Sequence, residues 1–213
     1  MVLNRFREKF DFLFAPIVNK MRNANPNVIT GISLIFAVGA GALFCLSSPE
    51  DALKNNFLLF GALMVGLNGL FDLLDGMVAH LSGKASAKGD FLDHAVDRYS
   101  DVLIIGGIGL SAWMTTSWIA LLAMTGVLLT SYMGTQAQAV GHKRDYGGLL
   151  GRADRLVILS VIPIVTHLLL YLNVSLPYFN LIEWSLIYFA VVGNLTAIQR
   201  FLSTFKWFNR GQK

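Results

Sequence analysis

The sequence predicts an all-α integral membrane protein with six transmembrane helices, preceded by an N-terminal interfacial amphipathic helix. Of the 213 residues, 54% are hydrophobic and only 14% are charged, and the mean hydropathy is +0.57. A soluble domain carries about 25% charged residues, so this deficit indicates that lipid surrounds much of the chain. The apolar residues also fall into runs of roughly 20, the length that an α-helix needs to cross a ~30 Å hydrocarbon layer.

The chain begins with a segment, residues 3–21, that mixes charged and apolar side chains. This segment lacks the uninterrupted apolar core of a signal peptide, so we predict an amphipathic helix that lies along the membrane interface within residues 1–24. Residues 25–205 are then expected to form one six-helix membrane domain, and residues 206–213 a basic cytoplasmic tail.

Six apolar runs follow, each separated from the next by a short polar segment. The predicted spans are residues 28–46, 57–80, 95–114, 118–140, 156–172 and 181–202. The polar segments are outer turns at 47–51, 115–117 and 173–177 and inner connections at 81–88 and 141–155. Spans and connections use nearly all of these residues, so no separate soluble domain is expected.

The basic residues fall almost entirely on one side of this topology. If both termini are cytoplasmic, 16 of the 17 Lys and Arg residues lie in inner segments or at inner span ends, and only Lys54 lies outside. Such a bias is typical of cytoplasmic loops. We therefore expect a multi-pass protein of the cell membrane with cytoplasmic termini. The formal charge of +4 indicates contact with anionic lipid rather than with nucleic acid.

The acidic residues are concentrated at the inner ends of two consecutive spans. Six of the 13 lie between positions 72 and 101: Asp72, Asp75, Asp90, Asp93, Asp97 and Asp101. Asp72 and Asp75 share one helix face, as do Asp93 and Asp97, because residues three or four apart are neighbours on a helix. The short inner connection brings the two spans together, so these four carboxylates are expected to converge at the cytoplasmic surface.

Four carboxylates this close cannot all stay ionised without compensating positive charge. Two divalent ions, Mg²⁺ or Mn²⁺, are the expected compensation, because hard cations prefer oxygen ligands and serve pyrophosphate chemistry. The alternative is a solvated helix end whose acids pair with Lys84, Lys88 and Arg98. Asp90 is assigned to the helix start and Asp101 to pairing with Arg98 or another basic residue.

These positions resemble the signature of the CDP-alcohol phosphotransferase family, D-x2-D-G-x2-A-R-x8-G-x3-D-x3-D. Seven of its eight fixed positions match: Asp72, Asp75, Gly76, Ala79, Gly89, Asp93 and Asp97. The exception is His80, where the family has arginine. Histidine carries a full charge only below a pKa of roughly 6.5, so we expect donor affinity or its pH dependence to be unusual.

The resemblance implies an enzyme that transfers a phospho-alcohol group from a CDP-linked lipid to a small polar alcohol and releases CMP. It implies that Asp72, Asp75 and Asp93 ligate metal, while Asp97 shares the metal site and acts as general base. It assigns donor binding to Gly76, Ala79, His80, Gly89 and Thr30. A homodimer is also implied.

The acceptor is predicted from a narrower resemblance, to the branch that makes phosphatidylinositol phosphate or archaetidylinositol phosphate. The segments DRYSD at 97–101 and GRADR at 151–155 carry it, together with TSY at 130–132. In that branch basic residues hold the phosphate of inositol 1-phosphate, which implies this role for Arg152, Arg155 and Arg200. The alternative for Arg200 is an arginine that extends to the membrane surface. Gly134 stands where the branch has lysine, so recognition would depend on the arginines or on residues 143–144.

Alternative functions differ from this one in the substrates or in the arrangement of acidic residues and spans that they require. Glycerol 3-phosphate as acceptor, or a soluble donor such as CDP-inositol, would use the same chemistry. A membrane prenyltransferase would need more spans and two separate Asp-rich motifs. A divalent-cation transporter would need acids near the membrane midplane on several helices, whereas here they lie at one end of two.

Overall fold

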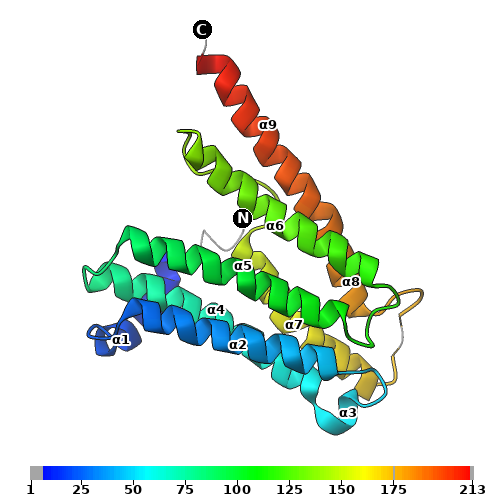
Figure 1. Ribbon diagram of the computed structural model, residues 1–213. Coiled ribbons are helices and arrows are strands. Elements are labelled where there is room, and N and C mark those ends of the chain that lie inside the picture. The colour runs from blue at the N-terminus through cyan, green and yellow to red at the C-terminus, as the bar shows by residue number, and fades with distance from the viewer. Residues whose placement is uncertain (1–6, 175, 212–213) are drawn as a thin grey trace.

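The computed structural model describes residues 7–174 and 176–211 as helices joined by short connections, with no strand in these ranges (Figure 1). Side chains are described for residues 14–174 and 176–209. The helices are α1 (Arg7–Lys20), α2 (Pro26–Leu46), α3 (Ala52–Asn55), α4 (Phe57–Leu81), α5 (Ala87–Gly109), α6 (Ser117–Ala139), α7 (Arg152–Tyr171), α8 (Leu181–Tyr188), the π-helical turn η2 (Phe189–Gly193) and α9 (Asn194–Gly211).

Five helices of the described chain are long and apolar enough to span a membrane. They are Pro26–Leu46, Phe57–Leu81, Ser117–Ala139, Arg152–Tyr171 and the continuous helix Leu181–Asn209. The all-α membrane class is therefore confirmed. The helix α5 has 23 residues, which is also long enough, but its first half carries the acidic cluster and it falls outside this set. The count of six spans stays a prediction.

Two helices begin earlier than the apolar runs that predicted them. Helix α5 begins at Ala87 rather than at residue 95, because the hydroxyl of Ser86 caps its start by accepting a 3.1 Å hydrogen bond from the amide of Gly89. Helix α7 begins at Arg152, so the inner connection predicted to reach residue 155 ends at Gly151. A search for apolar runs does not detect a first helical turn that is polar.

Two other boundaries also differ from expectation. Helix α5 ends at Gly109, and residues 110–116 form a turn rather than the end of a span. At the other end of the chain, residues 206–211, which we expected in a basic tail, continue α9 as a helix.

Close backbone contact holds the bundle together. In Figure 1, α2, α4 and α5 lie side by side, while α6 and α9 extend beyond them as a second arm. A Cβ atom on Gly107 of α5 would collide with the carbonyl oxygen of Gly41 of α2, so only glycine permits this approach. Small residues at such contacts are typical of membrane helices, because van der Waals packing rather than water exclusion drives their association.

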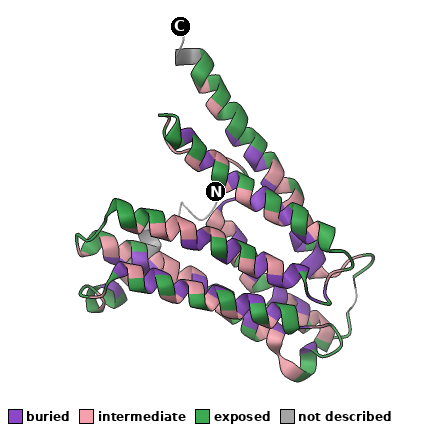
Figure 2. Cartoon of the chain, viewed as in Figure 1, coloured by how far each residue is buried: buried purple, intermediate pink, exposed green. Residues whose placement is uncertain are grey.

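Large apolar side chains cover the outside of the helices. Ile35, Leu63 and Leu122 are 67%, 53% and 54% exposed. Figure 2 shows exposed positions along every long helix, around a narrow buried interior. A soluble protein would cover these faces with charge, whereas lipid accepts them.

The N-terminal helix α1 packs against the start of α2 and the end of α4. Its Val18 is fully buried among Ile29 of α2 and Leu74 and Val78 of α4. Since α4 carries Asp72 and Asp75, this contact supports the end of the helix from which the acidic cluster projects.

Candidate active site

Four aspartates from two helices form one acidic cluster, as the spacing predicted. Carboxylate oxygens of Asp72, Asp75 and Asp93 all lie within 4.8 Å of one another. A second group within the same distance joins Asp93 and Asp97 to a nitrogen of His94. Asp93 belongs to both groups, so the cluster offers two adjacent sets of ligands that share one carboxylate.

Polar contacts from α2 hold the α4 side of this cluster in place. Asp75 is buried, and the hydroxyl of Thr30 donates a 2.5 Å hydrogen bond to its Oδ2. One turn before Asp72, the buried amide of Asn68 donates to the carbonyl of Ser33 at 2.9 Å. These bonds fix α4 against α2, and they fix the direction in which its carboxylates point.

The counter-charge of the cluster comes from α7 rather than from the loop lysines. Nη1 of Arg152 lies 2.5 Å from Asp72 Oδ2, and Nη2 lies 2.6 Å from Asp97 Oδ1. Lys84 instead donates to the carbonyls of Asn23 and Ala24 at 3.1 and 3.0 Å. The alternative of a helix end neutralised by its own loop is therefore wrong for Lys84.

A second ion-paired group lies one turn further along α5. Asp101 is buried and pairs with Nη1 of Arg98 at 3.1 Å, as expected, and also with Nη2 of Arg155 at 3.0 Å. Arg98 also approaches Asp97, at 3.4 Å. Arg152 and Arg155 thus lie three residues apart on one face of α7, each facing an aspartate of α5.

Arg200 is buried and hydrogen-bonded to the backbone, so it does not extend to the membrane surface. Its Nε donates to the carbonyl of Gly147 at 2.8 Å and its Nη1 to that of Thr130 at 2.6 Å. Gly134 leaves the room for it, since a Cβ there would lie 2.9 Å from Nη1. The structure does not bring Arg200 into contact with the acidic cluster.

The predicted donor-binding residues lie around the start of α2, the end of α4 and the start of α5. A Cβ on Gly76 would meet open space, so a ligand can approach the helix there. A Cβ on Gly89 would approach Asn27 Oδ1 at 3.4 Å, at the start of α2. Ala79 is half-buried and His80 is exposed near the end of α4.

The cluster fits a divalent metal ion. Its ligands are carboxylate oxygens with one imidazole, the set that Mg²⁺ or Mn²⁺ accepts. Oδ1 of Asp72 is buried without a hydrogen-bond partner in the described part of the chain, which leaves a lone pair available for a metal, whereas Oδ1 of Asp97 is approached by Arg152. The sequence pattern did not identify His94 as a candidate ligand. Its position next to Asp93 was the signal that could have indicated this role.

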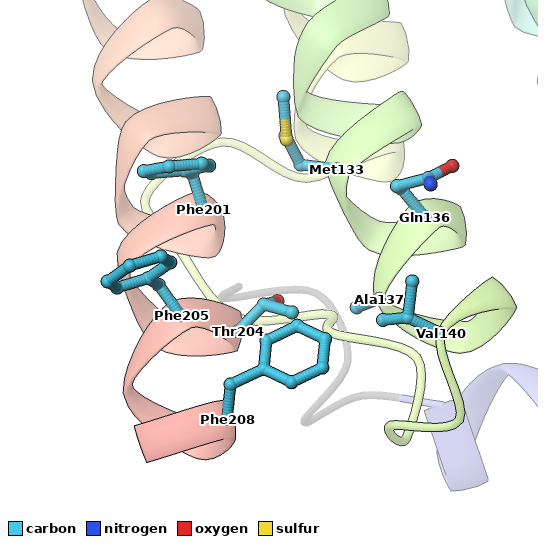
Figure 3. Close-up of a pocket in the computed structure, with 8 residues that line it drawn as sticks. All are labelled: Met133, Gln136, Ala137, Val140, Phe201, Thr204, Phe205 and Phe208. Carbon is cyan, nitrogen blue, oxygen red and sulfur yellow. The ribbon is translucent and has the colours of Figure 1, made fainter.

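A separate hollow lies between α6 and α9, in the second arm (Figure 3). It has a cavity volume of about 160 Å³. Its lining is Met133, Gln136, Ala137, Val140, Phe201, Thr204, Phe205 and Phe208. This lining contains no charged side chain and none of the clustered aspartates, so it is unsuited to phosphate chemistry.

Comparison with known proteins shows the family of this chain. The sequence profile described as CDP-alcohol phosphatidyltransferase matches residues 23–196. The archaetidylinositol phosphate synthase of Methanothermobacter thermautotrophicus is 30% identical over 203 residues, which cover 94% of this chain and 93% of that protein. The phosphatidylinositol phosphate synthase of Mycobacteroides abscessus is 30% identical over 159 residues, which cover 71% of this chain and 68% of that protein.

Solved structures show the same arrangement of helices. The phosphatidylinositol phosphate synthase of Mycobacterium tuberculosis, in complex with manganese and citrate, matches with a TM-score of 0.71 at 25% identity. The match covers 89% of this chain and 88% of that one. The structure of the same synthase with CDP-DAG bound also gives 0.71, at 26% identity, and covers 89% and 92% of the two chains.

Fold and site together define a membrane-embedded transferase with a divalent-metal centre. The chain belongs to the CDP-alcohol phosphatidyltransferase family. It is therefore a multi-pass membrane enzyme that transfers a phosphate-containing group from a CDP-linked donor. Membership in this family decides against the prenyltransferase and transporter alternatives.

Proposed function

We propose that this enzyme transfers a phosphatidyl or archaetidyl group from a CDP-linked lipid to inositol 1-phosphate and releases CMP. The observation that carries the proposal is the pairing of the acidic cluster on α4 and α5 with arginines on one face of α7. Such a site offers oxygen ligands for metal on one side and guanidinium groups for a phosphate monoester on the other. The names of the relatives support both the donor and the acceptor.

Two divalent ions, Mg²⁺ or Mn²⁺, would be held by the two ligand sets that share Asp93. Asp72, Asp75 and Asp93 form one set, and Asp93 and Asp97 with His94 form the other. Bound there, the ions supply neutralisation of the pyrophosphate charge and polarisation of its phosphorus–oxygen bonds.

Asp97 is our general base. Its carboxylate is buried in the first half of α5, and its Oδ1 is contacted by Nη2 of Arg152 at 2.6 Å without hydrogen-bond geometry. It accepts the proton of the acceptor hydroxyl, whose oxygen then bonds to the β-phosphorus of the donor. The bond from that phosphorus to the oxygen bridging to CMP breaks, and CMP leaves with the electron pair. No covalent enzyme intermediate is needed.

The donor nucleotide would bind over the inner ends of α2, α4 and α5. The open space at Gly76 accommodates it, and Ala79 and Gly89 keep its path free of large side chains. His80 stands where the family arginine would meet donor phosphates. Thr30 contributes through Asp75, which it orients.

The acceptor phosphate would bind among the arginines. Arg155 is buried with its Nε unpartnered in the described chain, and Arg152 and Arg98 lie within its electrostatic reach. Arg200 supports the connection between α6 and α7 through its hydrogen bond to the carbonyl of Gly147. Glycerol 3-phosphate also carries a phosphate monoester, so the acceptor assay below must compare the two.

The site is proposed to face the cytoplasm, as do both termini, because the basic residues lie at its end of the bundle. We also propose a homodimer in the membrane. Detergent-solubilised protein examined by light scattering with correction for bound detergent would test the second point.

The test is CMP release by purified full-length protein in detergent with Mg²⁺ or Mn²⁺. CDP-archaeol, CDP-diacylglycerol and CDP-inositol would each be paired with inositol 1-phosphate, glycerol 3-phosphate and inositol. We expect release with a CDP-linked lipid and inositol 1-phosphate, lost in Asp97→Asn and kept in Asp51→Asn, whose side chain is 52% exposed and pairs with Lys54. Release only with glycerol 3-phosphate, or only from CDP-inositol, would overturn the assignment of acceptor or donor.

A further inference from the structure

Arg152 binds the same carboxylates that a metal ion would need. Its guanidinium bridges α4 and α5 from α7, reaching Asp72 Oδ2 at 2.5 Å and Asp97 Oδ1 at 2.6 Å. Asp72 and Asp97 belong to different ligand sets of the cluster, so this one side chain touches both sets. A guanidinium and a divalent ion repel each other, and two cations cannot share those oxygens at contact distance.

Arg152 does not use all its hydrogen-bond donors at the aspartates. Its Nε and Nη2 have no hydrogen-bond partner in the described chain, although both are buried. Nη2 is close to Asp97 Oδ1, but the contact lacks hydrogen-bond geometry. Arginines that serve as permanent struts usually form parallel, well-aligned bonds to a carboxylate. Arg152 can therefore be replaced by another cation at the aspartates, because its guanidinium loses few well-aligned hydrogen bonds when it leaves them.

The charges of the surrounding residues favour such an exchange. Five buried or half-buried carboxylates, Asp72, Asp75, Asp93, Asp97 and Asp101, lie among four guanidinium groups, those of Arg98, Arg152, Arg155 and, through its contact with His94, Arg144. When a divalent ion replaces Arg152 at these carboxylates, two positive charges stand in place of one, and the net negative charge of the cluster falls. The released guanidinium would join those of Arg155 and Arg98. Three positive charges together are favoured when an anion binds among them.

Arg152 can also move without moving its helix. It is the first residue of α7, directly after Gly151, and its side chain is 20% exposed. Its long side chain has several rotatable bonds, and Arg155 lies one turn along the same face. A change of rotamer would therefore be enough to take the guanidinium away from the aspartates without a change in the fold.

We propose that Arg152 and a divalent ion occupy the Asp72–Asp97 pair in alternation, so that metal binding releases Arg152 to bind the phosphate of the incoming substrate. The identity of that phosphate rests on the proposed function. The competition itself requires only that the aspartates bind a divalent ion. Metal and phosphate acceptor are then positively coupled, because the metal supplies the acceptor site with a free arginine.

The test is the affinity for Mn²⁺ alone, measured by electron paramagnetic resonance on full-length protein in detergent. Apparent affinity is the intrinsic affinity multiplied by the fraction of time that Arg152 leaves the site free, so Arg152→Ala should bind Mn²⁺ about tenfold or more tightly than the wild type. Arg152→Lys should also bind more tightly, since one ammonium cannot bridge two carboxylates as a guanidinium does. Arg155→Ala removes the same charge one turn away without touching Asp72 or Asp97, and should change the affinity several-fold less.

A second readout follows inositol 1-phosphate binding by calorimetry with and without Mn²⁺. Wild-type protein should bind it more tightly with Mn²⁺, and Arg152→Ala should lose most of that gain. Unchanged or weaker Mn²⁺ affinity in both Arg152 variants, or equal tightening in Arg155→Ala, would overturn the exchange. Those outcomes would leave the proposed function unaffected. Absence of CMP release by the wild type would instead count against the proposed function, and tighter Mn²⁺ binding by the Arg152 variants would still support the exchange.

Discussion

The hydroxyl of Thr30 lies 2.5 Å from Oδ2 of Asp75 and 3.1 Å from the carbonyl of Pro26. A hydroxyl has one proton, and it is donated over the shorter contact to the carboxylate, which is the stronger acceptor. Thr30 thus donates from α2 to a carboxylate of α4 inside the bundle. A residue that the sequence placed in the nucleotide pocket is, in the structure, a direct support of a proposed metal ligand.

Replacing Thr30 by Val should weaken metal binding without changing side-chain volume much. The substitution leaves Asp75 Oδ2 without its donor, and loss of a bond that orients a ligand typically costs about 10–100-fold in metal affinity. Mn²⁺ titration followed by electron paramagnetic resonance measures the effect. Thr30→Ser keeps the hydroxyl and is the matched control, so equal losses in both variants would contradict this account.

Asp101 should be essential for stability because of Arg155. Both side chains are buried and lie 3.0 Å apart, so Asp101→Ala leaves a guanidinium buried with one partner lost. Breaking a buried pair in this way costs about 3–5 kcal/mol. We expect a large fall in the melting temperature in detergent, and partial recovery in the double variant Asp101→Ala with Arg155→Met. Absence of recovery would mean that Asp101 acts through Arg98 instead.

Gly134 should not tolerate even a methyl group. A Cβ there would lie 2.8 Å from the carbonyl oxygen of Asp145 and 2.9 Å from Nη1 of Arg200. Overpacking of this kind typically costs about 1–3 kcal/mol, so Gly134→Ala should lower the melting temperature. Gly31→Ala is the control, because a Cβ at Gly31 meets nothing within 4 Å. It should be neutral or stabilising, since alanine favours helix.

The same residue explains a departure from the expected motif. The branch lysine is absent at Gly134, and the space is used by Arg200, which reaches across to α6 and to Gly147. Sequence spacing identified both positions as unusual. It could not show that they are neighbours, because 66 residues separate them and only the packing of α9 on α6 brings them together.

The acidic cluster was predictable because its members are close in sequence and share helix faces. Helical spacing placed Asp72 with Asp75 and Asp93 with Asp97, and a short loop closed the two helices on each other. The position of Arg152 was not predictable in the same way. Its helix start depends on a cap, in which Asp154 accepts a 3.1 Å hydrogen bond from the amide of Gly151, and the apolar run begins four residues later.

The buried carboxylate of Glu183, at the opposite end of the bundle from the aspartates, supplies the last prediction. It accepts hydrogen bonds from the amide and hydroxyl of Thr115, at 2.7 and 2.6 Å, and from the amide and side chain of Asn180, at 3.2 and 2.9 Å. All four partners are donors. Glu183→Gln places an NH₂ group against at least one pair of them, which leaves donors facing a donor inside the protein.

An unpaired buried polar group costs about 1–3 kcal/mol, so Glu183→Gln should lower the melting temperature measurably. Its affinity for Mn²⁺ should equal that of the wild type, because Glu183 joins the start of α8 to the α5–α6 connection and touches no part of the metal site. Glu50→Gln, an exposed acid of the α2–α3 connection, should leave both quantities unchanged. Weaker Mn²⁺ binding in Glu183→Gln alone would show that the two ends of the bundle are coupled through α5.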